Sequence, residues 1–455
     1  LPLKDYDGIV EGNALRMDWA TLLRRTGQVP EARFNYIIGN PPFVGARNKS
    51  PEQASDIGSV FSGWKNNGNL DYVTCWYKKA ADYMVAHERT TRAAFVSTNS
   101  ICQGDGVATL WKPLFKQGVE IDYAWRTFRW DNESFEKSHV HVIIVGFHCV
   151  DSAAKGTQGG RKVIYDGDKC IEAKHINAYL TDAADVFVES IPKPLCAVPL
   201  AGMGNQPIDN GNYLFLPEEK EDFIKKEPGA AHLFHPWLGA EELINGKERH
   251  CLWLGDSSPV DLVNLPECVK RIEAVREYRL QSKRGSTKKL ADSPTHFQTE
   301  NMPKGNYIAI PEVSSGAREY VPMAFLTPNV LCSNKLRLLP AASLYHCGVL
   351  MSSVHMAWMR YVCGRLKSDY SYSINIVYNA FPWPVETDKA DTVKSEIEKT
   401  AQGILDARQK YAGASFAELY GEKMYLFADL VAAHEANDAA VLKAYGWPTD
   451  LSEPE

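Results

Sequence analysis

Three features that would point to other classes of protein are missing from this 455-residue sequence. Its ten cysteines are scattered singly with no C-x-x-C pair, so neither a zinc ribbon nor a disulfide framework is indicated. No apolar run approaches the length that spans a bilayer, and the first residues lack the basic and then apolar pattern of a signal peptide. We therefore expect a soluble, cytoplasmic protein with reduced thiols, no membrane segment and no bound metal.

An overall excess of positive charge, which is common in nucleic-acid-binding proteins, is also missing, because the net charge is −6. The negative charge is concentrated near the end, because residues 386–455 hold 14 acidic and 7 basic residues. Residues 1–385 hold the other 42 acidic and 43 basic residues and are therefore nearly neutral. By contrast, Lys270–Lys289 holds eight basic residues and two acidic ones. Composition alone leaves open whether this basic stripe is a solvated helix face with a loop or a phosphate-binding surface.

What the sequence does contain is an alternation of strand and helix patterns in its first third. Short apolar or alternating runs predict strands at 34–39, 92–98, 120–126 and 139–147. Apolar residues at helical spacing predict helices at 70–88 and 107–118. Strand and helix in alternation indicate an α/β sheet, and the length and 45% hydrophobic content allow two to four domains.

The composition of the sequence changes after residue 150, where residues 155–161 predict a turn or hairpin tip. Residues 191–212 are rich in Pro, Gly and Asn, which is typical of a connection between domains. Beyond them we expect short strands, a helix near 266–282 and a long buried helix within 344–365. Prolines within 379–389 mark another boundary, followed by two amphipathic helices. The predicted domains are 1–190, 191–385 and a helical C-terminal segment, 386–455.

The stretch FNYIIGNPPF, residues 34–43, ends an apolar strand in a rigid polar turn. In an open α/β sheet, ligands bind beyond the carboxyl ends of the strands. The prolines restrict Asn40 to an extended conformation, so its side-chain oxygen and the carbonyl of Pro41 can accept two hydrogen bonds from one NH₂ group. Phe43 offers a ring on which a planar base can stack. The alternative is a rigid turn with an aromatic plug.

This stretch resembles the NPP(Y/F/W) motif of amino-methyltransferases that use S-adenosyl-L-methionine, most closely the N6-adenine DNA methyltransferases. The resemblance implies that the catalytic residues are Asn40, Pro41, Pro42 and Phe43, and that the target adenine is flipped out of the duplex. Methylation of cytosine C5 is disfavoured, because its cysteine nucleophile lies in a Pro-Cys pair and no such dipeptide occurs here.

Two further stretches match the order of motifs in that family. In IVEGNALRMDW, the resemblance implies that Asn13 accepts a hydrogen bond from the adenine amine of the cofactor, although GNA could alternatively be only a tight turn. In FEKSHVHVIIVGF, it implies that Phe135 stacks on the flipped base together with Phe43. Phe128 and Trp130 are alternatives to Phe135 for this role.

Long blocks of the remaining sequence resemble the target-recognition region of the MmeI-like type IIL restriction-modification enzymes. These blocks are RIEAVREYRLQSKRGSTKKLADSPTHF, YIAIPEVSSGAREYVPMAF and GRLKSDYSYSINIVYNAFPWP. The resemblance makes double-stranded DNA the expected partner and the basic stripe a phosphate-contacting surface. The residues expected to contact phosphates are Lys270, Arg271, Arg276, Arg279, Lys283, Arg284, Lys288 and Lys289.

Base reading is expected from side chains that combine donors and acceptors suited to the major groove. The candidates are Arg318, Glu319, Lys335, Arg337, Arg365 and Lys367. Arg337 could instead be a strand residue that faces solvent, and Arg365 could pair only with Asp369.

The sequence departs from the family in one respect: no glycine motif of the FxGxG kind precedes NPPF, and no PD-(D/E)xK nuclease signature is evident. We therefore expect a partial class I (Rossmann-like) methyltransferase sheet, an α+β recognition domain and a helical segment. This implies that the upstream half of the methyltransferase domain is a missing partner, with or without a nuclease domain. Two other functions stay open: a DNA-binding module without catalysis, and a protein glutamine methyltransferase.

Overall fold

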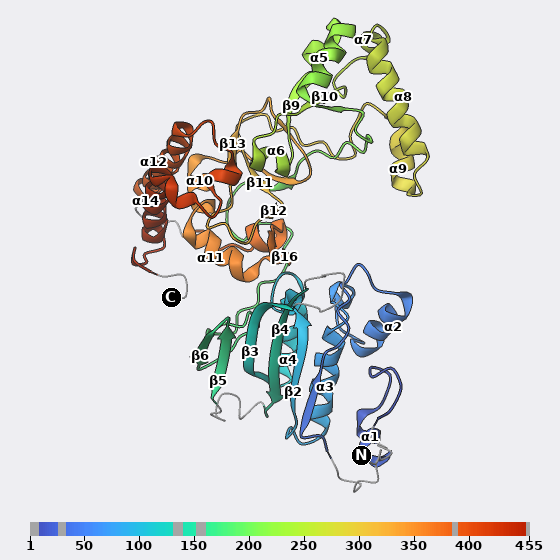
Figure 1. Cartoon of the computed structure of the whole chain (residues 1–455), viewed down its shortest axis with the longest axis vertical. Coiled ribbons are helices and arrows are strands. Elements are labelled where there is room, and N and C mark those ends of the chain that lie inside the picture. The colour runs from blue at the N-terminus through green and yellow to red at the C-terminus, as the bar shows by residue number, and fades with distance from the viewer. Residues whose placement is uncertain (1–8, 26–32, 131–139, 152–160, 385–389, 452–455) are drawn as a thin grey trace, which may run out of the picture. The chain divides into compact units, whose positions relative to one another are not determined.

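The computed structural model describes residues 9–25, 33–130, 140–151, 161–384 and 390–451. The chain packs as two compact units, whose elements are labelled in Figure 1. The first unit comprises Leu1–Ser190 together with Tyr361–Ser368. The second comprises Ile191–Arg360 and Asp369–Glu455. A short piece of chain from the recognition region is therefore part of the first unit.

A six-stranded sheet of order β1-β2-β4-β3-β5-β6 forms the centre of the first unit. Its strands are β1 (Tyr36–Gly39), β2 (Arg92–Thr98), β3 (Val119–Trp130), β4 (Val140–Cys149), β5 (Lys162–Asp166) and β6 (Lys169–Ala173). β1 and β2 are parallel, and β4 is antiparallel to both β2 and β3. The carboxyl ends of β1, β2 and β3 therefore lie at the same edge of the sheet. The predicted α/β fold is confirmed.

Helices cover one face of this sheet. The helical elements of the first unit are α1 (Trp19–Arg25), α2 (Pro51–Val60), η1 (Asn67–Asn69), α3 (Thr74–Ala86), η2 (Asn99–Ile101) and α4 (Gly106–Lys116). Tyr77 of α3 stacks on Phe147 of β4, with 5.4 Å between ring centroids, and meets Trp111 of α4 edge-on at 5.5 Å. Burying such a large side chain stabilises the unit by about 2–3 kcal/mol. The sheet and these two helices thus share one core.

The opposite face of the sheet carries exposed apolar side chains. Tyr36 and Ile38 of β1 are 70% and 78% exposed. The pairing register places Trp125 of β3 on the same face, where it stacks on Tyr165 of β5 at 4.9 Å. In the described part of the chain, β1 pairs with β2 and is an edge strand of the sheet. Apolar surface of this kind is suited to burial against further chain.

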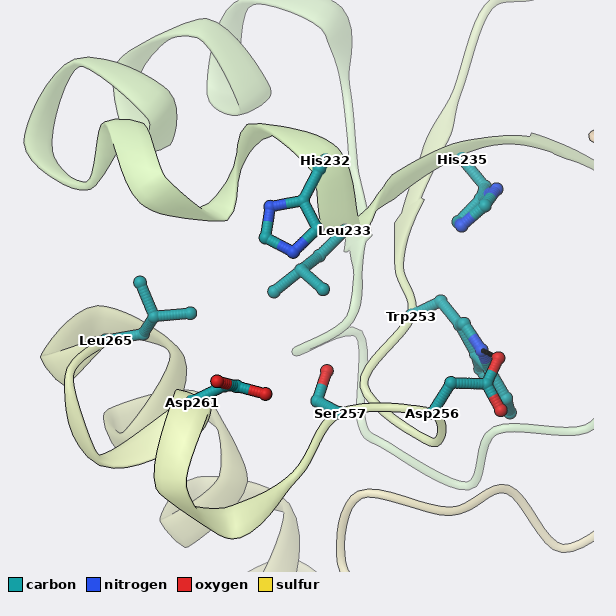
Figure 2. Close-up of a pocket in the computed structure, with 8 residues that line it drawn as sticks. All are labelled: His232, Leu233, His235, Trp253, Asp256, Ser257, Asp261 and Leu265. Carbon is teal, nitrogen blue, oxygen red and sulfur yellow. Dashed lines mark hydrogen bonds between the residues drawn. The ribbon is translucent and has the colours of Figure 1, made fainter.

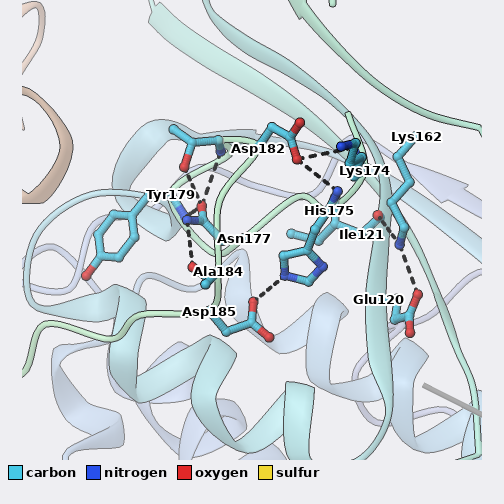
Figure 3. A network of polar contacts seen from close by, with 11 residues as sticks. Glu120, Ile121, Lys162, Lys174, His175, Asn177, Tyr179, Asp182, Ala184 and Asp185 are labelled. Carbon is cyan, nitrogen blue, oxygen red and sulfur yellow. Dashed lines mark hydrogen bonds and ion pairs between the residues drawn. The ribbon is translucent and has the colours of Figure 1, made fainter. Parts of the chain in front are cut away.

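A polar loop follows β6 and ends the first unit (Figure 3). The Asp182 carboxylate accepts hydrogen bonds from the main-chain N–H groups of Lys174 and His175 at 3.1 and 3.0 Å. The His175 ring lies 2.6 Å from the Asp185 carboxylate. Asn177 accepts from two further main-chain N–H groups at 3.0 and 3.2 Å. These side chains accept hydrogen bonds from main-chain N–H groups that have no partner in a strand or helix.

Two small sheets form the centre of the second unit, with orders β14-β9-β10-β8 and β13-β11-β15-β7. Their strands are β7 (Gly202–Met203), β8 (Leu214–Phe215), β9 (Phe234–Leu238), β10 (His250–Leu252), β11 (Tyr307–Pro311), β13 (Ala324–Leu326), β14 (Leu331–Cys332) and β15 (Leu336–Pro340). A shorter pair joins β12 (Val313–Ser314) to β17 (Asp369–Ser371). The sheet β14-β9-β10-β8 packs on an aromatic cluster in which Phe297 meets Trp253 at 5.0 Å.

The helices of the second unit connect and flank these sheets. They are α5 (Pro217–Lys226), η4 (Pro228–Leu233), α6 (Ala240–Asn245), α7 (Pro259–Val263), α8 (Pro266–Leu280), α9 (Gly285–Lys289), η5 (Leu290–Asp292), α10 (Leu344–Leu350), α11 (Ser353–Val362), η6 (Ile374–Tyr378), α12 (Ala390–Lys410), α13 (Phe416–Leu419), η7 (Met424–Leu426) and α14 (Ala428–Ala444). The helix predicted near 266–282 is α8, and the two predicted C-terminal helices are α12 and α14. No helix in the described ranges is long and apolar enough to cross a membrane.

The single long helix predicted within 344–365 is wrong, because the chain forms two helices there. α10 ends at Leu350 and α11 begins at Ser353. The hydroxyl of the buried Ser352 accepts a hydrogen bond from the N–H of His355 at 3.3 Å. A serine that satisfies an N–H group in the first turn begins a new helix even inside an apolar stretch.

Asp438 of α14 ties the C-terminal helices to the rest of the second unit. Its carboxylate accepts from the Tyr320 hydroxyl at 2.6 Å and from the main-chain N–H of Ser353 at 2.8 Å. Burial raises the pKa of Asp438 to about 6, because it outweighs the opposite effect of these two hydrogen bonds. Tyr320 directly follows two of the predicted base-reading residues, so α14 supports that stretch.

Candidate functional site

The NPPF motif lies where the sequence predicted it, directly after β1. The four residues follow Gly39 at the edge where β1, β2 and β3 have their carboxyl ends. Asn40 and Pro42 are exposed, Pro41 is buried and Phe43 is half-buried. The amide side chain of Asn40 is therefore accessible to a ligand, while Pro41 anchors the turn in the protein.

The Asp71 carboxylate connects the loop after this motif to the end of β2. One of its oxygens accepts from the main-chain N–H of Ala46 at 2.8 Å. Its other oxygen accepts from the Ser100 hydroxyl at 2.5 Å, and the Thr98 hydroxyl lies 2.8 Å from that of Ser100. A single carboxylate thus holds three segments of chain together at the edge that carries Asn40.

Further hydrogen bonds hold the same loop against the start of α3. The N–H of Tyr72 donates to the carbonyl of Val44 at 2.9 Å. The Lys49 ammonium donates to the carbonyls of Gly68 and Leu70 at 2.8 and 3.0 Å. Burial lowers the pKa of Lys49, against the opposing attraction of nearby carboxylate charge. The loop after the motif is therefore fixed by its main chain and by a side chain.

Asn13, the predicted cofactor contact, is exposed and held by its neighbours. Its NH₂ group donates to Asp56 at 3.0 Å, and its side-chain oxygen accepts from the N–H of Leu15 at 2.9 Å. An amide oxygen has two lone pairs, so it retains acceptor capacity for a ligand amine. The cofactor contact stays a prediction, and the tight turn that was its alternative is present as well.

Asp56 of α2 is a part of this site that the sequence analysis missed. Its carboxylate is 4% exposed and accepts from Tyr72, Arg16 and Asn13 at 2.7, 2.7 and 3.0 Å. Burial alone would raise the pKa of Asp56, but these three hydrogen bonds lower it overall. No local pattern marks this aspartate, because its three partners come from two segments distant from it in sequence.

Of the aromatic residues proposed to contact a flipped base, Phe135 lies outside the described residues. The two alternatives are at the carboxyl end of β3, the edge that also carries Asn40. The Phe128 ring lies between those of Trp125 and Trp130, with centroids 5.9 and 6.0 Å away, and Trp130 is 45% exposed. Neither Phe128 nor Trp130 is fully buried in the core, so the choice of the base-stacking residue among the three stays open.

Most of the basic stripe is accessible on α8, on α9 and between them. The exposed cations are Lys270, Arg276, Lys283, Arg284, Lys288 and Lys289. Lys270 pairs with Glu267 at 2.6 Å, and the half-buried Arg271 lies over the ring of Phe215 at 4.9 Å. The stripe as a whole is thus an available cationic surface, in which residues 283–289, at the start of α9 and within it, have the highest density of exposed charge.

Arg279 is the exception, and its predicted phosphate contact is wrong. Its side chain is completely buried, because residue 279 lies on the same face of α8 as the buried Val275 and Cys268. Its guanidinium donates, at 2.7–3.1 Å, to the main-chain carbonyls of Pro207, Ile208, Leu290, Ser293 and His296. Arg279 therefore holds the protein together and does not face DNA.

The predicted base readers of the second unit differ in accessibility. Glu319 and Lys335 are exposed, and Lys335 lies 3.3 Å from Glu312. Arg318 is half-buried and donates to a hydroxyl at 3.3 Å, and burial lowers its pKa. The side chain of Arg337 is only 12% exposed and pairs with Glu312 at 2.7 Å. Arg337 is thus neither a solvent-facing strand residue nor well placed to read bases.

Arg365 and Lys367 lie in the segment Tyr361–Ser368, which is part of the first unit. Arg365 is half-buried and donates to the carbonyl of Ser368 at 3.1 Å, whereas Lys367 is exposed. The short strand β16 (Gly364–Leu366) contains Arg365. These two candidates therefore belong to the unit that carries Asn40.

A cavity of about 270 Å³ lies in the second unit, away from the NPPF motif in sequence (Figure 2). Its lining is His232, Leu233, His235, Trp253, Asp256, Ser257, Asp261 and Leu265. The Trp253 ring N–H already donates to Asp256 at 2.7 Å. Within the described ranges, no three His, Cys, Asp or Glu side chains are grouped so that they could hold a metal ion.

Three models of one protein family match the chain in succession. The MmeI DNA-methyltransferase domain matches residues 1–165, the MmeI target recognition domain matches 182–385, and the MmeI C-terminal domain matches 389–454. These matches confirm the resemblance inferred from the sequence motifs.

Two known proteins are similar over nearly the whole chain. DNA methyltransferase A of Bacillus subtilis (strain 168) is 36% identical over 445 residues, which are 98% of this chain and 49% of that protein. The structure of the type IIL restriction-modification enzyme MmeI in complex with DNA is 38% identical, with a TM-score of 0.88 over 100% of this chain and 59% of that one. The chain spans about half the length of the curated relative it matches. It belongs to the MmeI family and comprises that family's DNA-methyltransferase, target recognition and C-terminal domains.

Proposed function

We propose that this chain supplies the target-binding part of a DNA methyltransferase that transfers a methyl group from S-adenosyl-L-methionine to N6 of a flipped adenine, within a restriction-modification system. The observation that carries the proposal is the exposed Asn40 amide after β1, in a loop held by Asp71. A rigid acceptor pair at the carboxyl edge of a sheet suits a reaction that depends on the orientation of an amine.

The chain's own residues orient the amine. The side-chain oxygen of Asn40 and the main-chain carbonyl of Pro41 accept one hydrogen bond each from the adenine NH₂ group, which directs its lone pair toward the methyl donor. These acceptors also stabilise the positive charge that develops on nitrogen during transfer. Phe43 stacks on the base and, with one of the aromatic residues near the end of β3, keeps it out of the duplex.

The residues present fit the adenine end of the cofactor. Asn13 has acceptor capacity for an amine, and Asp56 fixes the orientation of its amide. The cofactor supplies an electrophilic methyl group when bound. No glycine-rich motif of the FxGxG kind precedes NPPF in this sequence, so the fit concerns the adenine end alone.

DNA binding is divided between two sets of residues. The exposed cations of α8, α9 and the intervening turn contact phosphates without regard to sequence. Reading of bases falls to Arg318, Glu319 and Lys335, and to Arg365 and Lys367 in the unit that carries Asn40. The relative solved as a DNA complex, MmeI, supports DNA as the partner.

The central test is Asn40→Ala in the full-length protein. We expect methyl transfer to fall by about 100-fold or more, because the amine loses an orienting acceptor, while the dissociation constant for DNA changes less than about twofold. Asn48→Ala is the matched control, since Asn48 is an exposed asparagine in the same loop and should retain full activity. Incorporation of labelled methyl groups into DNA and fluorescence anisotropy measure the two quantities.

The alternatives predict different results in the same assays. A recognition module without catalysis would bind DNA specifically with no methyl transfer by the wild-type full-length protein. A glutamine methyltransferase would label protein instead of DNA. Equal losses of DNA binding and methyl transfer in Asn40→Ala would show that Asn40 holds the duplex and does not orient the amine.

A further inference from the structure

The segment Tyr361–Ser368 packs into the first unit although its neighbours in sequence, the start of α11 and β17, belong to the second. The N–H of Gly104 donates to the carbonyl of Val362 at 3.1 Å. Gly104 lies in the turn between η2 and α4, which begins where β2 ends. A stretch of the recognition region is thus hydrogen-bonded to the turn that follows a central strand of the methyltransferase sheet.

The approach of the two chains is close because both carry glycine. A Cβ atom on Gly104 would lie 3.2 Å from the Cα of Gly364, which is tighter than a normal contact between such atoms. Gly104 also has a φ of +72°, a conformation that side chains other than glycine rarely adopt. A Cβ atom on Gly364, by contrast, would lie 3.9 Å from the Cα of Gly104, an ordinary contact. The steric constraint therefore falls mainly on Gly104.

The same turn leads to the NPPF loop through two hydrogen bonds. Ser100, in η2, donates to one oxygen of Asp71, and the other oxygen of Asp71 accepts from the N–H of Ala46. Ala46 is six residues beyond Asn40, in a loop that begins with the rigid Pro41 and Pro42. A displacement of the turn after β2 would therefore move a support of the loop that presents Asn40.

We propose that Val362 and Gly104 are positioning residues for methyl transfer: they join the segment Tyr361–Ser368 to the turn at residues 99–106, which acts through Asp71 on the loop after Asn40. This inference rests on the proposed function of Asn40 and identifies what holds it in place. The recognition region then has two roles: it contacts DNA, and it completes the support of the site where the flipped base is held.

The first test compares Gly104→Ala with Gly63→Ala in the full-length protein. Gly63 has a similar φ of +81°, but a Cβ there would meet nothing within 4 Å, so this control matches the backbone strain without the clash. We expect Gly104→Ala to lower kcat for methyl transfer about tenfold or more, with KM and the dissociation constant for DNA changed less than about twofold. Gly63→Ala should leave kcat within about twofold of wild type.

Ser100→Ala provides a second test that introduces no clash and keeps the fold. It removes the hydrogen bond between η2 and Asp71, so we expect a similar loss of kcat and faster amide hydrogen exchange at Ala46. Gly104→Ala should show the same increase in exchange, and Gly63→Ala should not.

Unchanged kcat in both Gly104→Ala and Ser100→Ala, with wild-type exchange at Ala46, would overturn the inference. That result would leave the function of Asn40 intact, provided that Asn40→Ala is inactive in the same assay. If Asn40→Ala were fully active, the proposed function itself would fail. The two failures are therefore distinguishable.

Discussion

Replacement of Arg279 by lysine should destabilise the second unit more than any other charge-conserving change in the basic stripe. The arginine is completely buried and donates to five main-chain carbonyls. A lysine ammonium has three donors, so at least two of these carbonyls would lose their partner. At about 1–2 kcal/mol for each unsatisfied buried acceptor, the free energy of unfolding should fall by about 2–4 kcal/mol.

The assay is chemical denaturation of the 455-residue chain, followed by tryptophan fluorescence. Trp237 and Trp253 lie in the core next to α8 and report on this part of the second unit. Arg276→Lys is the matched control, since Arg276 is exposed on the same helix and its replacement should change stability by less than about 0.5 kcal/mol. A loss below that limit for Arg279→Lys would refute the assignment of a structural role.

Three further predictions concern DNA binding and pH. Removing the positive charges of residues 283–289 should weaken DNA binding to all sequences. It should also reduce the slope of log K against log salt by about 0.9 for each phosphate that is no longer neutralised, as measured by anisotropy at several salt concentrations. The residues to change are Lys283 and Arg284 before α9 and Lys288 and Lys289 within it. Replacing Arg318 or Glu319 by alanine should instead alter the preferred DNA sequence in a binding-site selection. An equal loss of affinity for every DNA sequence would contradict a role in base reading. The third prediction concerns Asp438, whose pKa of about 6 in the folded protein lies above that of an unfolded aspartate. Its contribution to stability is therefore present at low pH and is lost as the pH rises through about 6. Asp438→Asn should remove this loss from denaturation curves measured between about pH 4.5 and 7, whereas Glu435→Gln, an exposed change on the same helix, should retain it.

The elements that local patterns specify could be predicted from the sequence. Strand β2 was predicted with its observed bounds, because its alternation of buried and half-buried residues follows from one face packing on α3. The break at Ser352 was missed, since an apolar stretch of that length indicates one helix unless the capping role of the serine is recognised.

Only those residues of the site that are neighbours in the sequence could be predicted. The NPPF motif can be recognised from the sequence, because four neighbouring residues supply the hydrogen-bond acceptors, the rigid backbone and the aromatic ring. Arg279 was misassigned because charge was counted without the helical spacing that places it with Val275 and Cys268, a signal that the sequence did contain. Asp56 and Asp71 act through partners about 16 to 43 residues away, which local patterns cannot reveal.

The membership of Tyr361–Ser368 in the first unit bears on how chimeric enzymes of this family should be built. A graft that exchanges residues 191–385 as one block would also replace the strip of chain that packs on Gly104. The close approach at this junction, where a Cβ atom on Gly104 would lie 3.2 Å from the Cα of Gly364, would then depend on the path of the donor's chain. A graft that keeps the host's residues 361–368, and exchanges only the recognition segments on either side, would retain the native fit at this junction.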